Sequence, residues 1–133
     1  MGIKHLDAIV LRTNDLERCA AFYRAVGLQV KEEKHGDGPA HFACELGAVH
    51  FAIYGADTEG TPLARTAGGA TMIGFQVDSV ETAFEAAVNS GGTPVVEPDD
   101  YPWGRRALVR DPDGRAVEFN CAPGLPVRSV SGS

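Results

Sequence analysis

Apolar and polar residues alternate in two runs near the end of the chain, Arg105 to Arg110 and Arg115 to Asn120. Alternation with a period of two is typical of β-strands, because successive side chains point to opposite faces. Between the runs, residues 111–114 read Asp-Pro-Asp-Gly, in which proline fixes φ, aspartate caps the bend and glycine accepts a positive φ. The pattern predicts a β-hairpin. Its last strand has an apolar face and a mixed face, the latter formed by Ala116, Glu118 and Asn120.

The first half of the chain predicts a strand, a helix and three further strands. Alternation runs from Ile3 to Thr13, and an apolar stripe at three- and four-residue spacing then indicates a helix that ends at Gly27. Asn14 and Glu17 fit a capping box at the start of this helix. The following strands are expected at Leu28 to Glu33, Ala40 to Leu46 and Val49 to Tyr54, the last two forming a hairpin.

The same order recurs in the second half of the chain. A strand at residues 70–77 is expected to lead into a helix capped by Asp78, with Glu81 in the capping-box position and a stop at residues 91–92. A strand at residues 93–97 then precedes the hairpin described above. Asn14 and Asp78 are 64 residues apart, as are the glycines that end the two helices, so the chain contains an internal repeat.

This repeat predicts an α+β fold of two βαβββ modules, whose curved mixed sheets form an open barrel-like pocket with the helices outside. The modules are expected at about residues 3–54 and 70–122, joined by a linker at residues 55–69, as one domain over residues 1–122. Residues 123–133 carry Pro, Gly and Ser with little apolar surface, which predicts a flexible C-terminal tail.

Composition narrows the classes of function. With 44% hydrophobic and 23% charged residues, the chain is ordinary for a soluble globular protein. No run approaches the roughly 18 apolar residues of a membrane span and no signal peptide is recognised, so the cytoplasm is the expected compartment. A net charge of −6 argues against a nucleic-acid partner and favours neutral or cationic small ligands. Cys19, Cys44 and Cys121 are odd in number and widely spaced, which predicts buried free thiols.

Two segments resemble a known family. WGRRALVRDPDGRAVEFN (residues 103–120) resembles the closing hairpin of the vicinal oxygen chelate superfamily, which includes glyoxalase I, extradiol dioxygenases and the bleomycin resistance proteins. HLDAIVLRTNDLERCAAFYRAVGL (residues 5–28) resembles the opening strand and helix of that superfamily. The resemblance spans Ile3 to Cys121 and implies the paired-module fold. It says less about the reaction, because members share the scaffold and differ in chemistry.

The resemblance also implies where a metal ion would bind. In metal-using members, four symmetry-related strand positions present His, Glu or Gln to one divalent ion. With repeat offsets of 64 and 67, these positions fall on Ala8, Phe51, Met72 and Glu118. Only Glu118 has a ligand atom, whereas divalent sites need several donors, so no metal and no cofactor are expected. The histidines are expected to be satisfied within the fold, or to face the helices or solvent: His5, His35, His41 and His50.

Without a metal, the inner faces of the sheets are expected to bind an organic ligand, because they combine apolar walls with a few converging polar groups. Trp103 lies at the expected rim, where its indole could stack on a planar or cationic ligand, or instead plug the sheet or a dimer seam. Arg105 and Arg106 point to opposite faces, so only one of them can reach the pocket and pair with Glu118. The expected ligand-binding residues are Ala8, Val10, Phe51, Ile53, Met72, Gln76, Trp103, Glu118 and Asn120.

These observations favour a metal-free small-molecule binding protein, similar to the bleomycin resistance proteins, that sequesters an organic compound of cationic or aromatic character. The resemblance implies a homodimer with sites at or near the subunit interface. The alternative is a lyase, isomerase or dioxygenase of the same superfamily with a degenerate or relocated metal site, and a structural or regulatory module is a third option. The sequence has no nucleophile elbow and no phosphate-binding glycine loop. Glu118 is the one candidate catalytic residue, as a proton-abstracting base.

Overall fold

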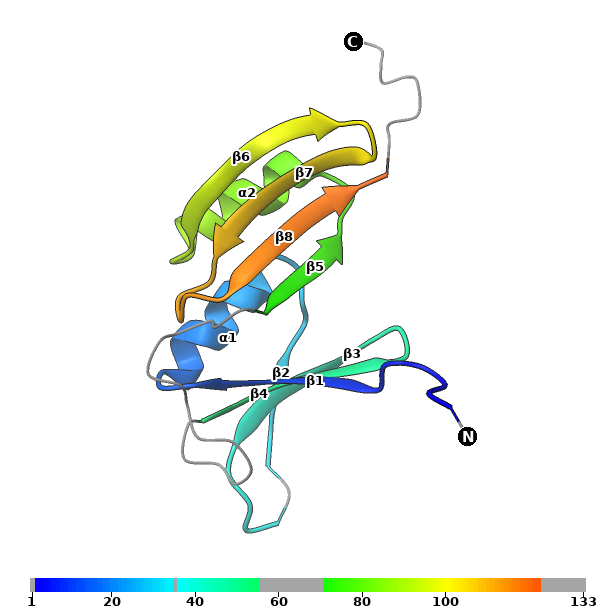
Figure 1. The fold of residues 1–133 in the computed structure, drawn as a ribbon. Helices are drawn as coiled ribbons and strands as arrows, with labels where there is room; N and C mark the ends of the chain where they lie inside the picture. Colours follow the sequence, from blue (N-terminus) through cyan, green and yellow to red (C-terminus); the bar gives the residue numbers. More distant parts are fainter. Residues whose placement is uncertain (1, 35, 56–70, 123–133) are drawn as a thin grey trace. The chain divides into compact units, whose positions relative to one another are not determined.

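The computed structural model describes residues 2–34, 36–55 and 71–122, and the chain divides into two units, residues 1–67 and 68–133 (Figure 1). Each unit contains a strand, a helix and three further strands. The first unit consists of β1 (Ala8–Thr13), α1 (Leu16–Ala25), β2 (Lys31–Glu33), β3 (His41–Leu46) and β4 (Val49–Gly55). The second unit consists of β5 (Met72–Gln76), α2 (Val80–Asn89), β6 (Thr93–Tyr101), β7 (Gly104–Arg110) and β8 (Ala116–Cys121).

Both units contain an open, mixed, four-stranded sheet with the same connectivity. In the first unit the strand order is β1-β4-β3-β2, with β1 parallel to β4 and the other neighbours antiparallel. In the second unit the order is β5-β8-β7-β6, with β5 parallel to β8. The helices have ten residues each and begin 64 residues apart, at Leu16 and Val80. The α+β fold and the internal repeat predicted from the sequence are therefore confirmed.

Some strand boundaries differ from those that the alternation predicted. β1 and β2 start later than expected, and β6 ends later. The late start of β2 follows from the way α1 ends. Gly27 has φ 114°, and the amide of Leu28 donates to the carbonyl of Tyr23 at 2.9 Å. Leu28 therefore belongs to the helix termination rather than to a strand.

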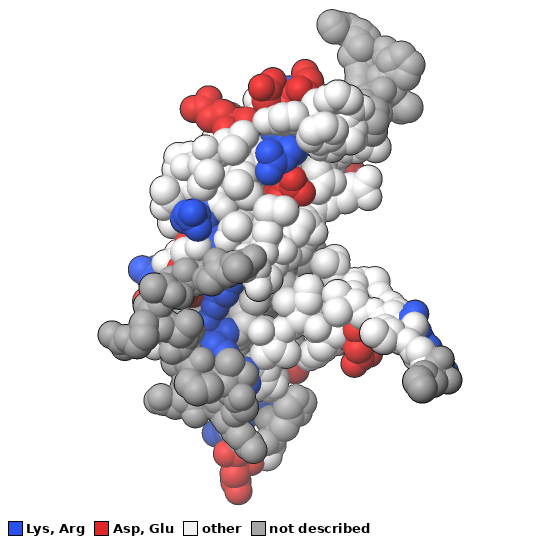
Figure 2. All heavy atoms as spheres, viewed as in Figure 1, with Lys and Arg blue, Asp and Glu red and all other residues white. Residues whose placement is uncertain are grey.

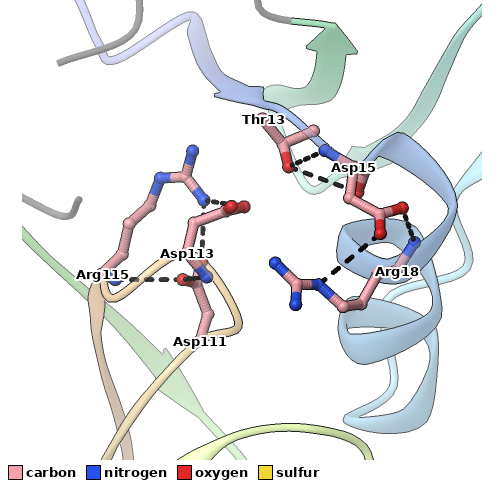
Figure 3. Close-up of polar contacts among 6 residues, drawn as sticks. All are labelled: Thr13, Asp15, Arg18, Asp111, Asp113 and Arg115. Atoms are coloured by element: carbon pink, nitrogen blue, oxygen red, sulfur yellow. Dashed lines mark hydrogen bonds and ion pairs between the residues drawn. The ribbon is translucent and has the colours of Figure 1, made fainter. Parts of the chain in front are cut away.

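Both helices begin one residue later than the predicted capping boxes. The N-cap of α1 is Asp15, not Asn14, and its Oδ1 accepts a hydrogen bond from the amide of Arg18 at 3.1 Å. The amide of Asp15 in turn donates to the hydroxyl of Thr13 at 3.0 Å (Figure 3). This bond fixes the cap at the end of β1.

The N-cap of α2 is Ser79, not Asp78, and its Oγ accepts a hydrogen bond from the amide of Thr82 at 3.1 Å. Each helix start offers two consecutive capping residues, and a glutamate three positions after the first of them favoured the wrong one. The same one-residue shift in both units leaves the 64-residue spacing unchanged.

In the first unit, α1 packs on one face of the sheet. Tyr23 of α1 contacts Phe51 of β4, with ring centroids 5.4 Å apart, and both side chains are fully buried. Ile9 pairs with Phe51 and Leu11 with Ile53 in the β1–β4 register, so these four share the helix-facing side. The opposite side, called here the helix-free face, carries Ala8, Val10, His50 and Ala52.

The assignment of Phe51 and Ile53 to the pocket face is therefore wrong. Neither side chain has exposed surface, and both lie on the side of the sheet that packs against α1. Because Ala52 between them is also buried, hydrophobicity along this strand does not show which side chains point which way.

The error came from the repeat offset. Aligning the turn glycines of the two hairpins gave an offset of 67 between the last strands of the modules. The strand registers give 66, because His50 lies opposite Ala8 of β1 just as Ala116 lies opposite Met72 of β5. A slip of one residue turns every side chain of a strand to the other face.

In the second unit, α2 covers one face of the sheet and lies behind it in Figure 1. Val117 and Phe119 of β8 and Ala87 of α2 have no exposed surface. Val80 of α2 is also buried, with 1% of its surface exposed. Because side chains alternate along β8, Glu118 lies on the helix-free face of this sheet, as the sequence predicted.

The turn between β7 and β8 is built around the carboxylate of Asp111, whose side chain has no exposed surface. This carboxylate accepts hydrogen bonds from the amides of Asp113 (2.9 Å) and Arg115 (3.0 Å) and from Nη1 of Arg115 (2.9 Å) (Figure 3). Gly114 has φ 91°, a value that glycine adopts without strain. The hairpin predicted from the sequence is confirmed.

Three further expectations concern thiols, chain segments and membranes. The three cysteines are free, but only Cys19 is buried, whereas Cys44 and Cys121 are half-buried. The predicted linker and tail, residues 55–69 and 123–133, lie outside the described residues except for Gly55, which ends β4. Within the described ranges, neither helix has the length and apolarity needed to cross a bilayer.

We expect Asp15→Ala and Ser79→Ala each to lower the free energy of unfolding by about 1 kcal/mol, because each removes the bond to a first-turn amide. The matched controls Asn14→Ala and Asp78→Ala are expected to change it by less than about 0.5 kcal/mol. Urea denaturation followed by circular dichroism gives all four values. Larger losses at positions 14 and 78 than at 15 and 79 would contradict the caps assigned here.

Candidate functional site

The second unit has a pocket of about 380 Å³ at the start of β7 and the end of β8. Volumes of about 300–1,000 Å³ are usual for sites that bind small organic molecules. The residues that line it are Gln76, Trp103, Gly104, Arg105, Arg106, Glu118, Asn120, Cys121 and Ala122.

An ion pair between Arg106 and Glu118 lies in this pocket, and each side chain is only about one-fifth exposed, at 20% and 18%. Nε of Arg106 donates to Oε2 of Glu118 at 2.6 Å, and Nδ2 of Asn120 donates to Oε1 at 3.2 Å. The bond to Glu118 raises the pKa of Arg106, although desolvation opposes the rise. Figure 2 shows basic and acidic side chains side by side on this face of the second unit.

The missing side chain of Gly74 gives Glu118 its place. Gly74 of β5 lies directly opposite Glu118 in the parallel register with β8. A β-carbon at position 74 would lie 3.4 Å from Oε1 of Glu118 and 3.8 Å from Nδ2 of Asn120. The carboxylate and the amide therefore lie over the glycine, where a β-carbon would make ordinary van der Waals contact with both and only a longer side chain would compete for their space.

Arg105, next to Arg106, is used differently. Its guanidinium forms an ion pair with Glu81 of α2, and its Nη1 contacts Oδ1 of Asp100 on β6 at 3.0 Å. Arg105 in turn lowers the pKa of Glu81, chiefly through the hydrogen bond between them. Of the two arginines, Arg106 is the one that pairs with Glu118. The expectation that only one of them reaches the pocket is wrong, because both Arg105 and Arg106 line it.

Two aromatic rings stand beside the ion pair. Tyr101 and Trp103 stack with ring centroids 5.2 Å apart and planes 26° apart. The guanidinium carbon of Arg106 lies 5.5 Å from the centroid of the Tyr101 ring. Trp103 remains 66% exposed, so most of its indole is accessible to a ligand.

The turn that carries Trp103 is held close to β8 by Gly104. This glycine has φ 141°, and a β-carbon built on it would lie only 2.2 Å from the carbonyl oxygen of Cys121. No other residue type fits at this position without moving the backbone.

The structure brings four of the predicted ligand-binding residues together, and these are Gln76, Trp103, Glu118 and Asn120. Met72 lies on β5 of the same unit but outside the pocket lining, and Ala8 and Val10 lie on β1 of the first unit. Whether any of these residues contacts a ligand stays a prediction. Cys121 and Ala122 also line the pocket and were not expected there, although the pairing of β7 with β8 places Cys121 opposite Arg105.

The histidines fall into different environments. His41 is buried and satisfied, with Nδ1 3.2 Å from the carbonyl oxygen of Pro39 and Nε2 3.4 Å from Oε1 of Glu33. His50 lies on the helix-free face opposite Ala8, where it is partly exposed, so of the expected orientations it has the one toward solvent rather than toward the helix. Its Nδ1 is 2.5 Å from Oε2 of Glu45. His5 is exposed, and His35 is outside the described residues.

The metal positions implied by the resemblance change accordingly. With the offset of 66, the β4 position equivalent to Glu118 is Ala52, which lies opposite Val10, so Phe51 has no part in such a set. Within the described part of the chain, no three His, Cys, Asp or Glu side chains are grouped so that they could hold a metal ion.

Solved structures share this fold. A glyoxalase/bleomycin resistance protein from Albidiferax ferrireducens T118 is 25% identical, with a TM-score of 0.69 over 89% of this chain and 98% of that chain. A glyoxalase-related enzyme from Fulvimarina pelagi is 22% identical, with a TM-score of 0.71 over 90% of this chain and 88% of that chain. TioX from Micromonospora sp. ML1 is 23% identical, with a TM-score of 0.65 over 90% and 99% of the two chains.

Sequence comparison gives the family. An uncharacterized protein of Mycolicibacterium smegmatis is 31% identical over 120 residues, which cover 90% of this chain and 95% of that protein. The model of one protein family matches residues 3–119, from the start of the first module almost to the end of β8. This chain belongs to the Glyoxalase/Bleomycin resistance protein/Dioxygenase superfamily.

Proposed function

We propose that this protein binds a small organic compound in the pocket of the second unit without using a metal ion. The observation that carries the proposal is the state of Glu118, whose two oxygens already accept hydrogen bonds from Arg106 and Asn120. A divalent ion at this carboxylate would have to displace the guanidinium or lie beside its positive charge, and both cost free energy. The pocket instead offers an organic ligand an exposed indole and the two side-chain amides of Gln76 and Asn120.

The proposal extends to the compartment, the oligomeric state and the role of the protein in the cell. The protein is expected to act as a cytoplasmic homodimer that sequesters its ligand, with resistance to a toxic compound as one role that such binding would serve. The Albidiferax ferrireducens relative is named as a glyoxalase/bleomycin resistance protein, which supports the comparison. Size-exclusion chromatography with light scattering measures the oligomeric state directly.

One observation favours the alternative, a lyase, isomerase or dioxygenase with a relocated metal site. His50 lies on the helix-free face of the first unit with Nδ1 bound to the carboxylate of Glu45. Histidines that bind metals through one nitrogen commonly hold a carboxylate or carbonyl with the other. His50 is therefore the residue from which a relocated site would be built.

The ligand prediction concerns Trp103, the only tryptophan of the chain. A two-ring aromatic compound that binds in this pocket is expected to shift the single indole N–H peak in a ¹H–¹⁵N spectrum. Trp103→Ala is expected to weaken such a compound by about 1 kcal/mol, roughly a fivefold rise in Kd, because stacking is lost. Val95→Ala, which alters an exposed apolar residue of β6 outside the pocket, is the control. A bound compound that leaves the indole peak unmoved would place the site elsewhere.

The metal prediction concerns thermal stability. Chelation with EDTA is expected to leave the melting temperature unchanged, because no ion contributes to the native state. An ion bound only to the native state at 100 times its Kd would add about 2.7 kcal/mol, which is a shift of several degrees for a chain of this size.

Calorimetry before and after EDTA, and again with Zn²⁺, Ni²⁺ or Mn²⁺, measures the effect. A drop in melting temperature that a metal restores would refute the metal-free proposal. The variants His50→Ala and Glu118→Gln then identify which residue binds the metal ion, because the change in melting temperature on adding metal disappears in the variant that lacks that residue.

A further inference from the structure

We infer that the ligand of this pocket carries an anionic oxygen group on a planar ring system, an aromatic carboxylate, and that Arg106 recognises this group. The inference rests on the proposed function, because it names the ligand class of the same pocket. It departs from the cationic ligand that the net charge of −6 and the carboxylate of Glu118 suggested from the sequence.

Arg106 is held in place but keeps bonding capacity. A guanidinium has five N–H groups, and Arg106 uses Nε for Glu118 and has one further side-chain hydrogen bond, with Tyr101. Some of the N–H groups on its two Nη atoms therefore remain for a ligand. The ring of Tyr101 lies against the guanidinium at 5.5 Å and limits its movement. A planar fork of N–H groups fixed in this way matches the two oxygens of a carboxylate, and little side-chain entropy is left to lose on binding.

Glu118 is poorly placed to receive a cation. Each of its oxygens has a donor, Nε of Arg106 at 2.6 Å and Nδ2 of Asn120 at 3.2 Å. A cationic ligand would have to separate a pair that is about four-fifths buried, or lie beside the positive charge of Arg106. The acidic side chains of β6, visible along one edge of the second unit in Figure 2, attract cations only over the roughly 8 Å that salt leaves unscreened.

Arg106 differs from the other polar groups of the pocket in what it offers a ligand. Arg105 is paired with two carboxylates, Glu81 and Asp100, whereas Arg106 is paired with one, Glu118, so Arg106 keeps more of its bonding capacity for a ligand. The amides of Gln76 and Asn120 line the same pocket and add further N–H donors. These amides also carry acceptor oxygens, so the guanidinium of Arg106 is the group that favours an anionic oxygen on the ligand.

Trp103 supplies the surface for the ring system. Its indole stacks on Tyr101 on one side and is 66% exposed. Tyr101 links the two halves of the site, because it contacts both the indole and the guanidinium of Arg106. A ligand with its ring on Trp103 and its carboxylate on Arg106 would use both groups at once.

The test uses three probes with one ring system and different charges: naphthoate, naphthamide and naphthylmethylammonium. Isothermal titration calorimetry of the full chain at pH 7 gives their dissociation constants, and the indole N–H peak of Trp103 reports whether each binds at this pocket. Naphthoate is expected to bind at least about tenfold more tightly than the ammonium compound, the range for one hydrogen bond to a charged group.

The variants isolate the contribution of Arg106. Arg106→Gln is expected to weaken naphthoate about tenfold or more, to the level of the uncharged naphthamide. Arg110→Gln removes the same charge from the same strand outside the pocket lining and is expected to change naphthoate binding less than about twofold. If Arg106→Gln fails to fold because Glu118 is left unpaired, the double variant Arg106→Gln/Glu118→Gln removes both charges and takes its place.

Each other outcome overturns the inference. Tighter binding of the ammonium compound, lost in Glu118→Gln, would show a cation site and leave the proposed function intact. Equal binding of naphthoate by wild type and Arg106→Gln would remove Arg106 from recognition. If none of the three probes moves the indole peak, the ligand class is wrong, whereas the proposed function fails only if a broad screen of organic compounds also finds no binding.

Discussion

The structure of each unit depends on one constraint: one face of each sheet is committed to its helix. In β8, Val117 and Phe119 have no exposed surface. Because side chains alternate, this burial forces Glu118 and Asn120 onto the other face. The antiparallel register then sets Arg106 directly opposite Asn120, which is two residues along β8 from Glu118. The polar cluster is therefore positioned by apolar packing on the far side of the same strands.

The ion pair in this cluster orients groups more than it stabilises the fold. Removing two charges from water costs several kcal/mol per ion, and the attraction between them roughly offsets that cost. Arg106 and Glu118 are each about one-fifth exposed, so the cost of desolvation and the attraction between the charges are both smaller than in a dry interior. The pair instead orients the guanidinium of Arg106, because the carboxylate of Glu118 holds it by a hydrogen bond and the ring of Tyr101 packs against it.

Periodicity predicted most of this fold, and its failures have physical causes. The hairpin around residues 111–114 was clear because apolar and polar residues alternate on both sides of a proline-glycine turn. Phe51 and Ile53 were misplaced because three consecutive buried residues carry no alternation, so their orientation depended on an offset that was wrong by one. The helix caps were missed by one residue because two adjacent side chains can each cap, and only the geometry of the first turn chooses between them.

The site was predictable in part for the same reason. The sequence placed Arg105 and Arg106 on opposite faces, and it contained the signal that chooses between them. Arg105 shares its parity with Ala107 and Val109, which are buried on the helix side, so Arg106 had to be the arginine on the face of Glu118. The pocket itself could not be predicted, because its shape depends on how closely the turn before β7 approaches the end of β8.

That close approach gives the turn one fixed and one variable position. Gly104 cannot accept a side chain, since a β-carbon there would overlap the carbonyl oxygen of Cys121 at 2.2 Å. The preceding residue, Trp103, is largely exposed, so its side chain is not limited by contact with β8. A library built to change what the protein binds should therefore randomise position 103 and keep glycine at 104, because most members that vary both would fail to close the hairpin. For protein engineering, the backbone conformation of this turn has to be kept, whereas the side chain at position 103 can be varied.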